Sequence, residues 1–304
     1  MSYATPQALR AALTSRARRR AHEHGLKAGQ LVEQFYYQRL LARVFHHAPD
    51  DWLLKGGQAL LVRYPAARHS RDIDLFRPET ADIDEAVSLL VEAAGIDLGD
   101  HLRYSLRKRT AVVAGGINAR LTFAVSTGVK SAGTINVDVV VGLSPQGDPV
   151  GQKLQPAVPL DWLHDWPTVT LYPIVDHVAD KICALYERHG AERMASTRYR
   201  DLVDLILIAL QQPLDGQQLQ AALRNEEARR HNLGTTLELP RSIHIPAGAR
   251  WPSGYRAAAA DVPGLDEYRT IDRAVVLAQS FLDPVLTTGD PGYWTPTTRS
   301  WQPR

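Results

Sequence analysis

The residues of this 304-residue sequence best suited to chemistry are two carboxylates spaced two residues apart, Asp72 and Asp74. They stand in a short apolar run that predicts a strand from residue 71 to residue 76. Side chains alternate between the two faces of a strand, so both carboxylates point one way while Ile73 and Leu75 point into the core. Paired oxygen ligands on one rigid surface suit a divalent cation such as Mg²⁺.

Two glycines, Gly56 and Gly57, precede the carboxylates and are expected to open a helix after a short strand at residues 52–54. Because they lack a Cβ, their backbone can come close to a phosphate. Lys55 stands just before them and could contact that phosphate or cap the strand. The ordered set of glycines and carboxylates predicts a site for a Mg²⁺-bound nucleoside triphosphate (NTP).

A third acid, Asp138, lies in another predicted strand, from residue 134 to residue 142. The strand places it opposite an apolar row made by Ile135, Val137, Val139 and Val141. From that position Asp138 could complete a metal site, since bound cations offset the repulsion between neighbouring acids. In nucleotidyl transfer such cations bridge the phosphates, polarise the reacting phosphorus and stabilise the departing pyrophosphate.

Arg68 and Ser70 stand just before the carboxylate strand and are candidate nucleotide ligands. The arginine could grip a triphosphate by a bidentate contact, or it could be an ordinary solvated loop residue. Ser70 shares the face of the two carboxylates, so it could hydrogen-bond the triphosphate or simply end the strand. The candidate nucleotide-binding set is therefore Lys55, Gly56, Gly57, Arg68 and Ser70.

The elements that position these residues predict a first domain over residues 1–165. Two helices come first, at residues 6–24 and 28–47. The strand, helix and strand that carry the glycines and the first two acids follow, with that helix ending near residue 64. A helix and three strands complete the domain, at residues 83–94, 101–114, 117–127 and 134–142.

A second domain, over residues 166–304, is predicted to be mainly helical. After a strand at residues 168–173, helices are expected at residues 175–188, 197–211 and 216–231. A loop-like stretch rich in Pro and Gly spans residues 235–265, and a helix at 266–282 precedes a tail with two Trp residues. Together the two domains predict an α+β fold with a mixed sheet.

Composition limits the classes of partner. With 44% hydrophobic and 22% charged residues the chain is an ordinary globular protein, and its net charge is only +2. Any nucleic-acid binding must therefore come from local patches. The sequence offers two basic patches. One lies on the first helix and could contact a phosphate backbone or be a solvated helix face; it consists of Arg16, Arg18, Arg19 and Arg20. The other surrounds Tyr104 and could face an acceptor RNA or be a charged strand edge; it consists of Arg103, Arg107, Lys108 and Arg109.

The single cysteine, Cys183, is expected to be a buried, inert thiol in a reducing compartment. The N-terminus lacks the apolar core of a secretory signal, and no uncharged apolar run approaches the roughly 20 residues that span a bilayer. The best apolar run, residues 202–210, is short and contains Asp204. These features predict a cytoplasmic protein.

The motifs resemble those of known nucleotidyltransferases. Gly56-Gly57 followed by Asp72-Ile-Asp74 resembles the signature of the polymerase-β-like nucleotidyltransferase superfamily. The longer strings, Lys55-Gly-Gly-Gln-Ala-Leu and Arg68-x-Ser-x-Asp72-Ile-Asp74-Leu, are similar to one branch of it. That branch is the AbiEii-type (MenT-type) toxins of type IV toxin–antitoxin systems, and the resemblance covers roughly residues 52–210. It implies a polymerase-β-like core.

Members of this branch also carry a lysine and an aspartate on successive helices, which Lys181 and Asp201 match. The resemblance makes Lys181 a phosphate or leaving-group ligand and Asp201 a residue that orients it or the attacking group. Ordinary ion pairs, of Lys181 with Asp180 and of Asp201 with Arg198 or Arg200, would also explain them. The implied catalytic set is Asp72, Asp74, Lys181 and Asp201, with metal ligands Asp72, Asp74 and Asp138.

The resemblance implies a Mg²⁺-dependent enzyme, with Mn²⁺ as an alternative, that transfers a nucleoside monophosphate (NMP) from an NTP. It implies the 3′ end of a tRNA as acceptor, a block of translation, and a winged-helix DNA-binding antitoxin as partner. The helical domain is then expected to complete the active-site cleft. Two alternatives remain open: transfer to a protein or small-molecule hydroxyl, and a non-catalytic nucleotide-binding interaction protein.

Overall fold

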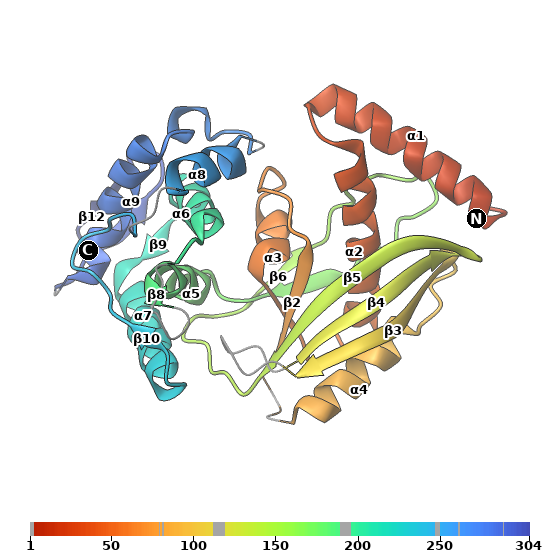
Figure 1. The fold of residues 1–304 in the computed structure, drawn as a ribbon, viewed down its shortest axis with the longest axis horizontal. Coiled ribbons are helices and arrows are strands. Elements are labelled where there is room, and N and C mark those ends of the chain that lie inside the picture. The colour runs from red at the N-terminus through yellow and green to blue at the C-terminus, as the bar shows by residue number, and fades with distance from the viewer. Residues whose placement is uncertain are drawn as a thin grey trace. The chain divides into compact units, whose positions relative to one another are not determined.

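The computed structural model describes residues 3–78, 80, 82–111, 119–188, 196–246, 250–260, 262–287 and 289–304. The chain forms two compact units, which are described separately (Figure 1). The first unit comprises Met1–Arg63, His69–Ser144 and Pro149–Tyr172. The second comprises Tyr64–Arg68, Pro145–Asp148 and Pro173–Arg304.

The first unit is built on a seven-stranded sheet with the strand order β3-β4-β5-β2-β1-β7-β6. β2 pairs with β5 and β1 pairs with β7 in parallel, while the other neighbours are antiparallel. The sheet is therefore mixed, and the expected α+β fold class is confirmed. Its strands are β1 (Leu53–Lys55), β2 (Asp72–Arg77), β3 (Leu102–Ala111), β4 (Ala119–Thr127), β5 (Lys130–Val141), β6 (Val150–Lys153) and β7 (Thr168–Leu171).

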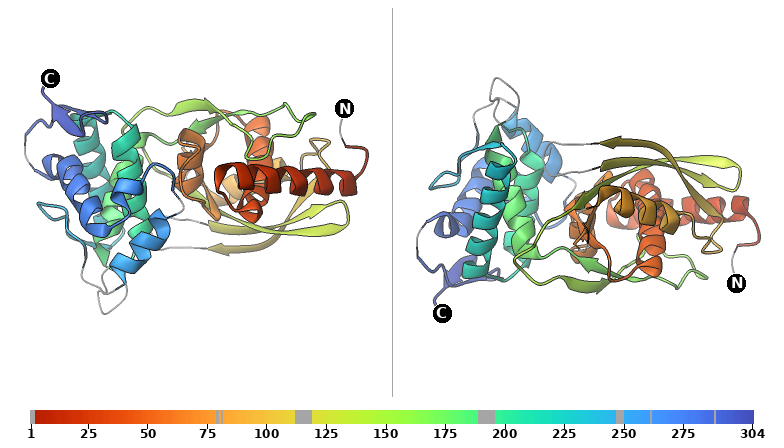
Figure 2. Two further views of the ribbon diagram at one scale, coloured as in Figure 1. Left: turned by 90° about the horizontal axis from the view of Figure 1, so that it is seen from above. Right: turned by 90° about the horizontal axis from the view of Figure 1, so that it is seen from below.

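The helices of the first unit are α1 (Pro6–His24), α2 (Ala28–His47), α3 (Gly56–Arg63) and α4 (Ile83–Ala94). The predicted bounds of α1, α2 and α4 are confirmed. Thr5 caps the start of α1, since its hydroxyl accepts a hydrogen bond from the Ala8 N–H, and Gly25 in the left-handed conformation caps its end. Figure 2 shows α1, α2 and α4 on one side of the strands β3, β4 and β5.

The core of the first unit lies between these helices and the sheet. Ile73 and Leu75 of β2, and Val137 and Val139 of β5, are fully buried in it, as their alternation predicts. The intervening residues of both strands face the other way. The hydrophobic pattern therefore fixes which face of the sheet carries the acids.

The second unit is mainly helical. Its central helix is α6 (Tyr199–Gln211), whose apolar residues are almost all buried, and which packs against α5, α8 and α9. Cys183 is buried in α5, and burial raises the pKa of its thiol, as expected for an inert cysteine. The other helices are α5 (Ile174–Tyr186), α7 (Gly216–Asn232), α8 (Trp251–Ala259) and α9 (Ile271–Leu286), with a 3₁₀ turn at Asp266–Tyr268.

Short strands connect the helices of the second unit. β8 (Glu187–Arg188) pairs with β10 (Thr236–Leu237), and a small sheet has the order β12-β11-β9. Its strands are β9 (Leu214–Asp215), β11 (Tyr293–Thr295) and β12 (Ser300–Gln302). None of the helices within the described ranges combines the length and the apolar character needed to cross a membrane.

Parts of the second unit differ from the sequence prediction. The stretch at residues 235–265, which was predicted to be a loop, contains α8. Its Pro252 does not break this helix, because it lies in the first turn, where a missing N–H is tolerated. The expected tail is a hairpin whose Trp294 is fully buried. The strand ends predicted at residues 112–114 and 117–118, with the Gly-Gly turn between them, lie outside the described residues.

Candidate functional site

Three carboxylates share one face of the sheet in the first unit. In the parallel register of β2 and β5, Asp72 lies opposite Asn136 and Asp74 lies opposite Asp138. Matched residues of neighbouring strands point the same way, so all three acids project from the face opposite the core. Asp138 is 3% exposed, whereas Asp72 and Asp74 are half-buried. The predicted juxtaposition of these carboxylates is therefore present.

The two glycines pack directly against this acidic strand. Gly56 has φ +62°, and a Cβ built on it would overlap the carboxylate of Asp74. A Cβ on Gly57 would likewise overlap the side chain of Ser70. Both positions must therefore be glycine, because β2 and the segment just before it approach the start of α3 too closely for any side chain. The sequence alone did not reveal this reason. This cradle leaves the Asp74 carboxylate beside the backbone that opens α3.

Ser70 and Lys55 lie at the edges of the cradle. The Gln58 side chain donates a hydrogen bond of 3.0 Å to the carbonyl of Ser70, which fixes the entry of the chain into β2. Lys55 is matched with Asp74 in the antiparallel register of β1 and β2. Its Nζ lies 4.2 Å from the centre of the Tyr172 ring, a cation–π contact that holds the ammonium group near the acidic face.

Arg120 of β4 is a site residue that the sequence reasoning missed. Its Nε and Nη2 each donate a hydrogen bond of 2.6 Å to the Asp138 carboxylate. These bonds to Asp138, together with the charges of Asp72 and Asp74, raise the pKa of Arg120 above its ordinary value. The guanidinium group therefore supplies the positive charge that three neighbouring acids require. Its alternation with buried residues along β4 was the available signal.

The donor chemistry of this face fits a hard divalent cation, which prefers carboxylate oxygens. The cradle formed by Gly56 keeps one carboxylate beside a backbone that can receive phosphate. Within the described ranges, however, no group of three or more His, Cys, Asp or Glu residues is arranged to hold a metal ion. Both oxygens of Asp138 face Arg120 instead. Asp72 and Asp74 could hold an ion, and Asp138 could join them only by exchanging its partner.

A second charged cluster lies within the second unit. The Nζ of Lys181 on α5 donates hydrogen bonds to Asp201 (2.8 Å) and Asp204 (2.6 Å) on α6. Burial lowers the pKa of Lys181, but the two carboxylates outweigh burial and raise it. Burial raises the pKa of Asp201, and the charges of Lys181 and Arg198 outweigh burial and lower it. Lys181 and Asp201 are therefore both charged at neutral pH.

Arg68 belongs to this second cluster. Its Nε and Nη2 donate hydrogen bonds of 2.9 and 2.7 Å to the two oxygens of Asp204, which is itself buried. The bidentate contact expected with a triphosphate is thus made with an aspartate that the sequence reasoning did not select. Asp180, the alternative partner of Lys181, binds Arg230. The other alternative pair is present but loose, at 3.4 Å between Arg198 and Asp201.

The two basic patches differ from each other. On β3, Arg103, Arg107 and Lys108 are exposed, whereas Tyr104 is buried and donates its hydroxyl to the backbone of α2. The tyrosine is therefore not available for stacking on a base. On α1, Arg16 is bound to Asp161.

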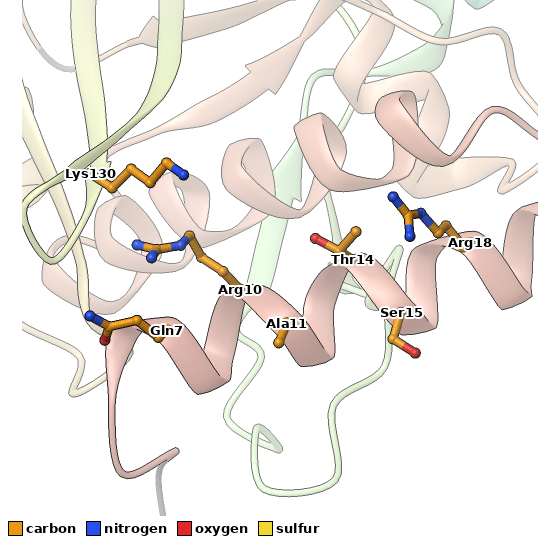
Figure 3. Close-up of a pocket in the computed structure, with 7 residues that line it drawn as sticks. All are labelled: Gln7, Arg10, Ala11, Thr14, Ser15, Arg18 and Lys130. Atoms are coloured by element: carbon orange, nitrogen blue, oxygen red, sulfur yellow. The ribbon is translucent and has the colours of Figure 1, made fainter.

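Arg18 instead lines a hollow of about 620 Å³ on α1, together with Arg10 and Lys130. Figure 3 shows the side chains of Arg10, Thr14 and Arg18 along one side of this helix, with Lys130 approaching from the β4–β5 hairpin. The hollow is a second place where cationic side chains gather within the first unit.

Comparisons with known proteins agree with the motifs. The model of the AbiEii nucleotidyl transferase toxin family, of type IV toxin–antitoxin systems, matches residues 39–276. The structure is similar to MenT4, a nucleotidyltransferase toxin from Mycobacterium tuberculosis H37Rv. The TM-score is 0.53 and the identity 15%, with 91% of this chain and 97% of that chain covered.

More distant structural matches include two further proteins. JHP933 from Helicobacter pylori has 16% identity and a TM-score of 0.37, covering 66% of this chain and 77% of that one. The CD-NTase CdnG from Bradyrhizobium diazoefficiens, solved in complex with GTP, has 13% identity and a TM-score of 0.26. It covers 85% of this chain and 92% of that one. No curated protein matches the sequence.

Proposed function

Since this chain belongs to the AbiEii family of type IV nucleotidyltransferase toxins, we propose that it transfers an NMP from an NTP to the 3′ end of a tRNA. Membership makes it a nucleotidyltransferase that uses an NTP, typically with a divalent metal, and that has a cognate antitoxin. The proposal adds that the metal is Mg²⁺ and that the modified tRNA cannot be aminoacylated, which blocks translation. It also adds that the antitoxin is a winged-helix DNA-binding protein.

The observation that carries the proposal is the shared face of Asp72, Asp74 and Asp138 beside the Gly56 cradle. Asp72 and Asp74, with Asp138 as a further ligand, would hold Mg²⁺ there, and the ion would supply positive charge that stabilises the departing pyrophosphate. Asp138 could alternatively accept the proton of the attacking hydroxyl. Either role requires Arg120, whose side chain is half-exposed, to release Asp138.

The remaining residues of the first unit would bind the triphosphate. The backbone at Gly56 and Gly57 opens α3 and presents N–H groups that suit a phosphate. Ser70, packed on Gly57, could donate its hydroxyl, and Lys55 adds a positive charge matched with Asp74 across the strands. These contacts would hold the phosphorus in line for attack, which supplies most of the catalysis in phosphoryl transfer.

In the second unit, we propose that the ammonium group of Lys181 stabilises the negative charge that develops on the leaving pyrophosphate. Asp201 and Asp204 fix its ammonium group from two sides, so Asp201 acts as a positioning residue. Arg68 holds Asp204 in place. To act as a triphosphate ligand as well, Arg68 would have to exchange this partner.

The test is incubation of total RNA with each α-labelled NTP and Mg²⁺, comparing the wild type with Asp72→Ala. Asp84→Ala, which removes an exposed acid on α4, is the matched control. Label in the tRNA band that depends on Asp72 but not on Asp84, followed by loss of aminoacylation, is expected. Transfer unchanged by Asp72→Ala would overturn the mechanism. Label found only in a protein fraction would overturn the acceptor.

A further inference from the structure

The acidic face of the sheet continues across β5, β4 and β3 as an exposed polar surface. Along β4, Leu121, Phe123 and Val125 are buried in the core, while the residues between them are exposed or half-buried. Figure 2 shows helices on the core side of these strands, and no helix among the described residues of the first unit covers the other side. Beside the three acids, the sheet therefore offers an open platform.

A row of hydrogen-bonding side chains crosses this platform from the acids to the edge strand. Asn136 donates a hydrogen bond of 3.4 Å to Asp72 and accepts one of 2.9 Å from Thr122. The β3–β4 register places Lys108 directly opposite Thr122. Three strand spacings of about 4.8 Å put Lys108 about 14 Å from Asp72 on the same face.

An irregularity in β3 decides which basic residues face the platform. The pairing with β4 shifts between Leu106 and Lys108, so Arg107 is an extra residue of a bulge. Lys108 then shares the face of Thr122, whereas the adjacent Arg109 turns to the helical side and binds Asp84 of α4. Two neighbouring cations on one strand therefore point to opposite faces of the sheet.

A second cation stands on the platform side of the same strand. Arg103 lies opposite Ser126 in the register and alternates with the buried Tyr104. Within the part of the chain that the structure describes, neither Arg103 nor Lys108 forms an ion pair, and both are exposed. With Tyr104 buried, the edge offers cations without an aromatic platform. Such a surface binds phosphates and not bases.

We propose that Lys108 and Arg103 hold the sugar–phosphate backbone of the RNA acceptor while its 3′ end lies at the carboxylates. This inference rests on the proposed function, since it requires a nucleic-acid acceptor. At about 3.4 Å per stacked nucleotide, 14 Å corresponds to a phosphate about four nucleotides from the reacting end. The recognition is independent of base sequence, so it sets the reach and length of the acceptor rather than its identity.

The test compares charge reversals of adjacent residues. Lys108→Glu and Arg109→Glu change the charge equally on opposite faces of β3, and Arg18→Glu tests the α1 hollow. NMP transfer is measured with an eight-nucleotide RNA and with a dinucleotide that has the same 3′ end, and binding of the labelled eight-mer is measured from 50 to 200 mM salt. For Lys108→Glu we expect an unchanged kcat, a roughly tenfold higher KM for the eight-mer, and a shallower salt slope by about 0.7.

The controls separate the possible outcomes. Unchanged kinetics of Arg109→Glu and Arg18→Glu, and equal use of the dinucleotide by all variants, would support the proposal. Equal KM increases for Lys108→Glu and Arg109→Glu would overturn it, because net charge alone would then explain the effect. Loss of antitoxin binding by Lys108→Glu with unaltered RNA binding would also overturn it, because the β3 edge would then bind an acidic protein and not RNA. Failure of the wild type to modify any RNA would instead refute the proposed acceptor.

Discussion

Arg120 and Asp138, matched across β4 and β5, are joined by two hydrogen bonds of 2.6 Å that occupy both oxygens of the buried carboxylate. The pair lies beside two further acids on the same face of the sheet. The guanidinium group of Arg120 thus neutralises the Asp138 carboxylate at the position where the proposed divalent cation would bind. The proposed metal ion would have to compete with Arg120 for this carboxylate, and that competition can be measured.

We expect Arg120→Gln to bind Mn²⁺ more tightly than the wild type in the absence of nucleotide. Loss of one competing, half-exposed ion pair corresponds to about 1 kcal/mol, or about fivefold in affinity. Isothermal titration or electron paramagnetic resonance would measure the affinity. Arg16→Gln, which removes a different ion-paired arginine, should leave it unchanged. Weaker metal binding by Arg120→Gln would show that the two cations do not compete.

Gly56→Ala should abolish transfer, because its methyl group would displace the Asp74 carboxylate. Gly25→Ala is the matched control: its φ of +66° is nearly the same, but a Cβ there meets no atom within 4 Å. The left-handed backbone should lower the free energy of unfolding of each variant by about 1 kcal/mol, and the clash with Asp74 should add to this loss in Gly56→Ala alone. Only Gly56→Ala should lose activity, by more than about a hundredfold. Equal activities would mean that the cradle has no role in the reaction.

Asp204→Asn should strongly destabilise the second unit. The substitution leaves the buried Lys181 and the half-buried Arg68 without the carboxylate that both contact, which costs about 3 kcal/mol. Arg198→Ala, which removes the loose and exposed end of the same network, should cost less than about 1 kcal/mol. Urea unfolding of both variants would give the two values. Similar losses would show that burial of the cluster adds nothing.

The contribution of Asp201 to stability should depend on pH in the acid range. Its folded pKa is lowered below the ordinary 3.8, so its stabilisation is present above pH 3.8 and is lost as pH falls through the folded value. The difference in unfolding free energy between wild type and Asp201→Asn should therefore be constant from pH 5 to 8, and it should shrink below 3.8. Denaturant titrations at several pH values would measure it, and a constant difference down to the lowest pH would contradict the assignment.

The raised pKa of Lys181 predicts a loss of stability at alkaline pH. Its stabilisation is present below the ordinary pKa of 10.5 and is lost as pH rises through the folded value. Stability of the wild type should consequently decline at strongly alkaline pH. Lys181→Met should show a smaller decline, provided that Asp204 remains ion-paired with Arg68. An unchanged alkaline decline would assign it to other groups.

The sequence was sufficient to place the acids because strand parity is a local property. Alternation in β2 and β5 predicted that Asp72, Asp74 and Asp138 oppose an apolar row, and the register confirms it. Arg120 could not be paired in this way. Its partner is 18 residues away, and which residue of β5 it meets depends on a register that includes a shift between Val125 and Ser126.

Asp204 was missed for a different reason. It was treated as an interruption of an apolar run, whereas an acid inside a buried helix requires a buried partner. Its spacing of three residues from Asp201 places both carboxylates on one side of α6, which was the available signal. The identity of the partners, Lys181 from α5 and Arg68 from a distant segment, follows only from packing.

The alternation in β2 also limits how this enzyme can evolve. Asp72 and Asp74 stand between Ile73 and Leu75, so a single inserted or deleted residue would exchange the two sets of side chains. Aliphatic groups would then occupy the acidic face, and two charges would enter the core. Single substitutions can change this strand one side chain at a time, but an insertion or deletion within it would disrupt both the core and the proposed site in one step. Length variation among relatives should therefore fall in the connections on either side of β2 and not within it.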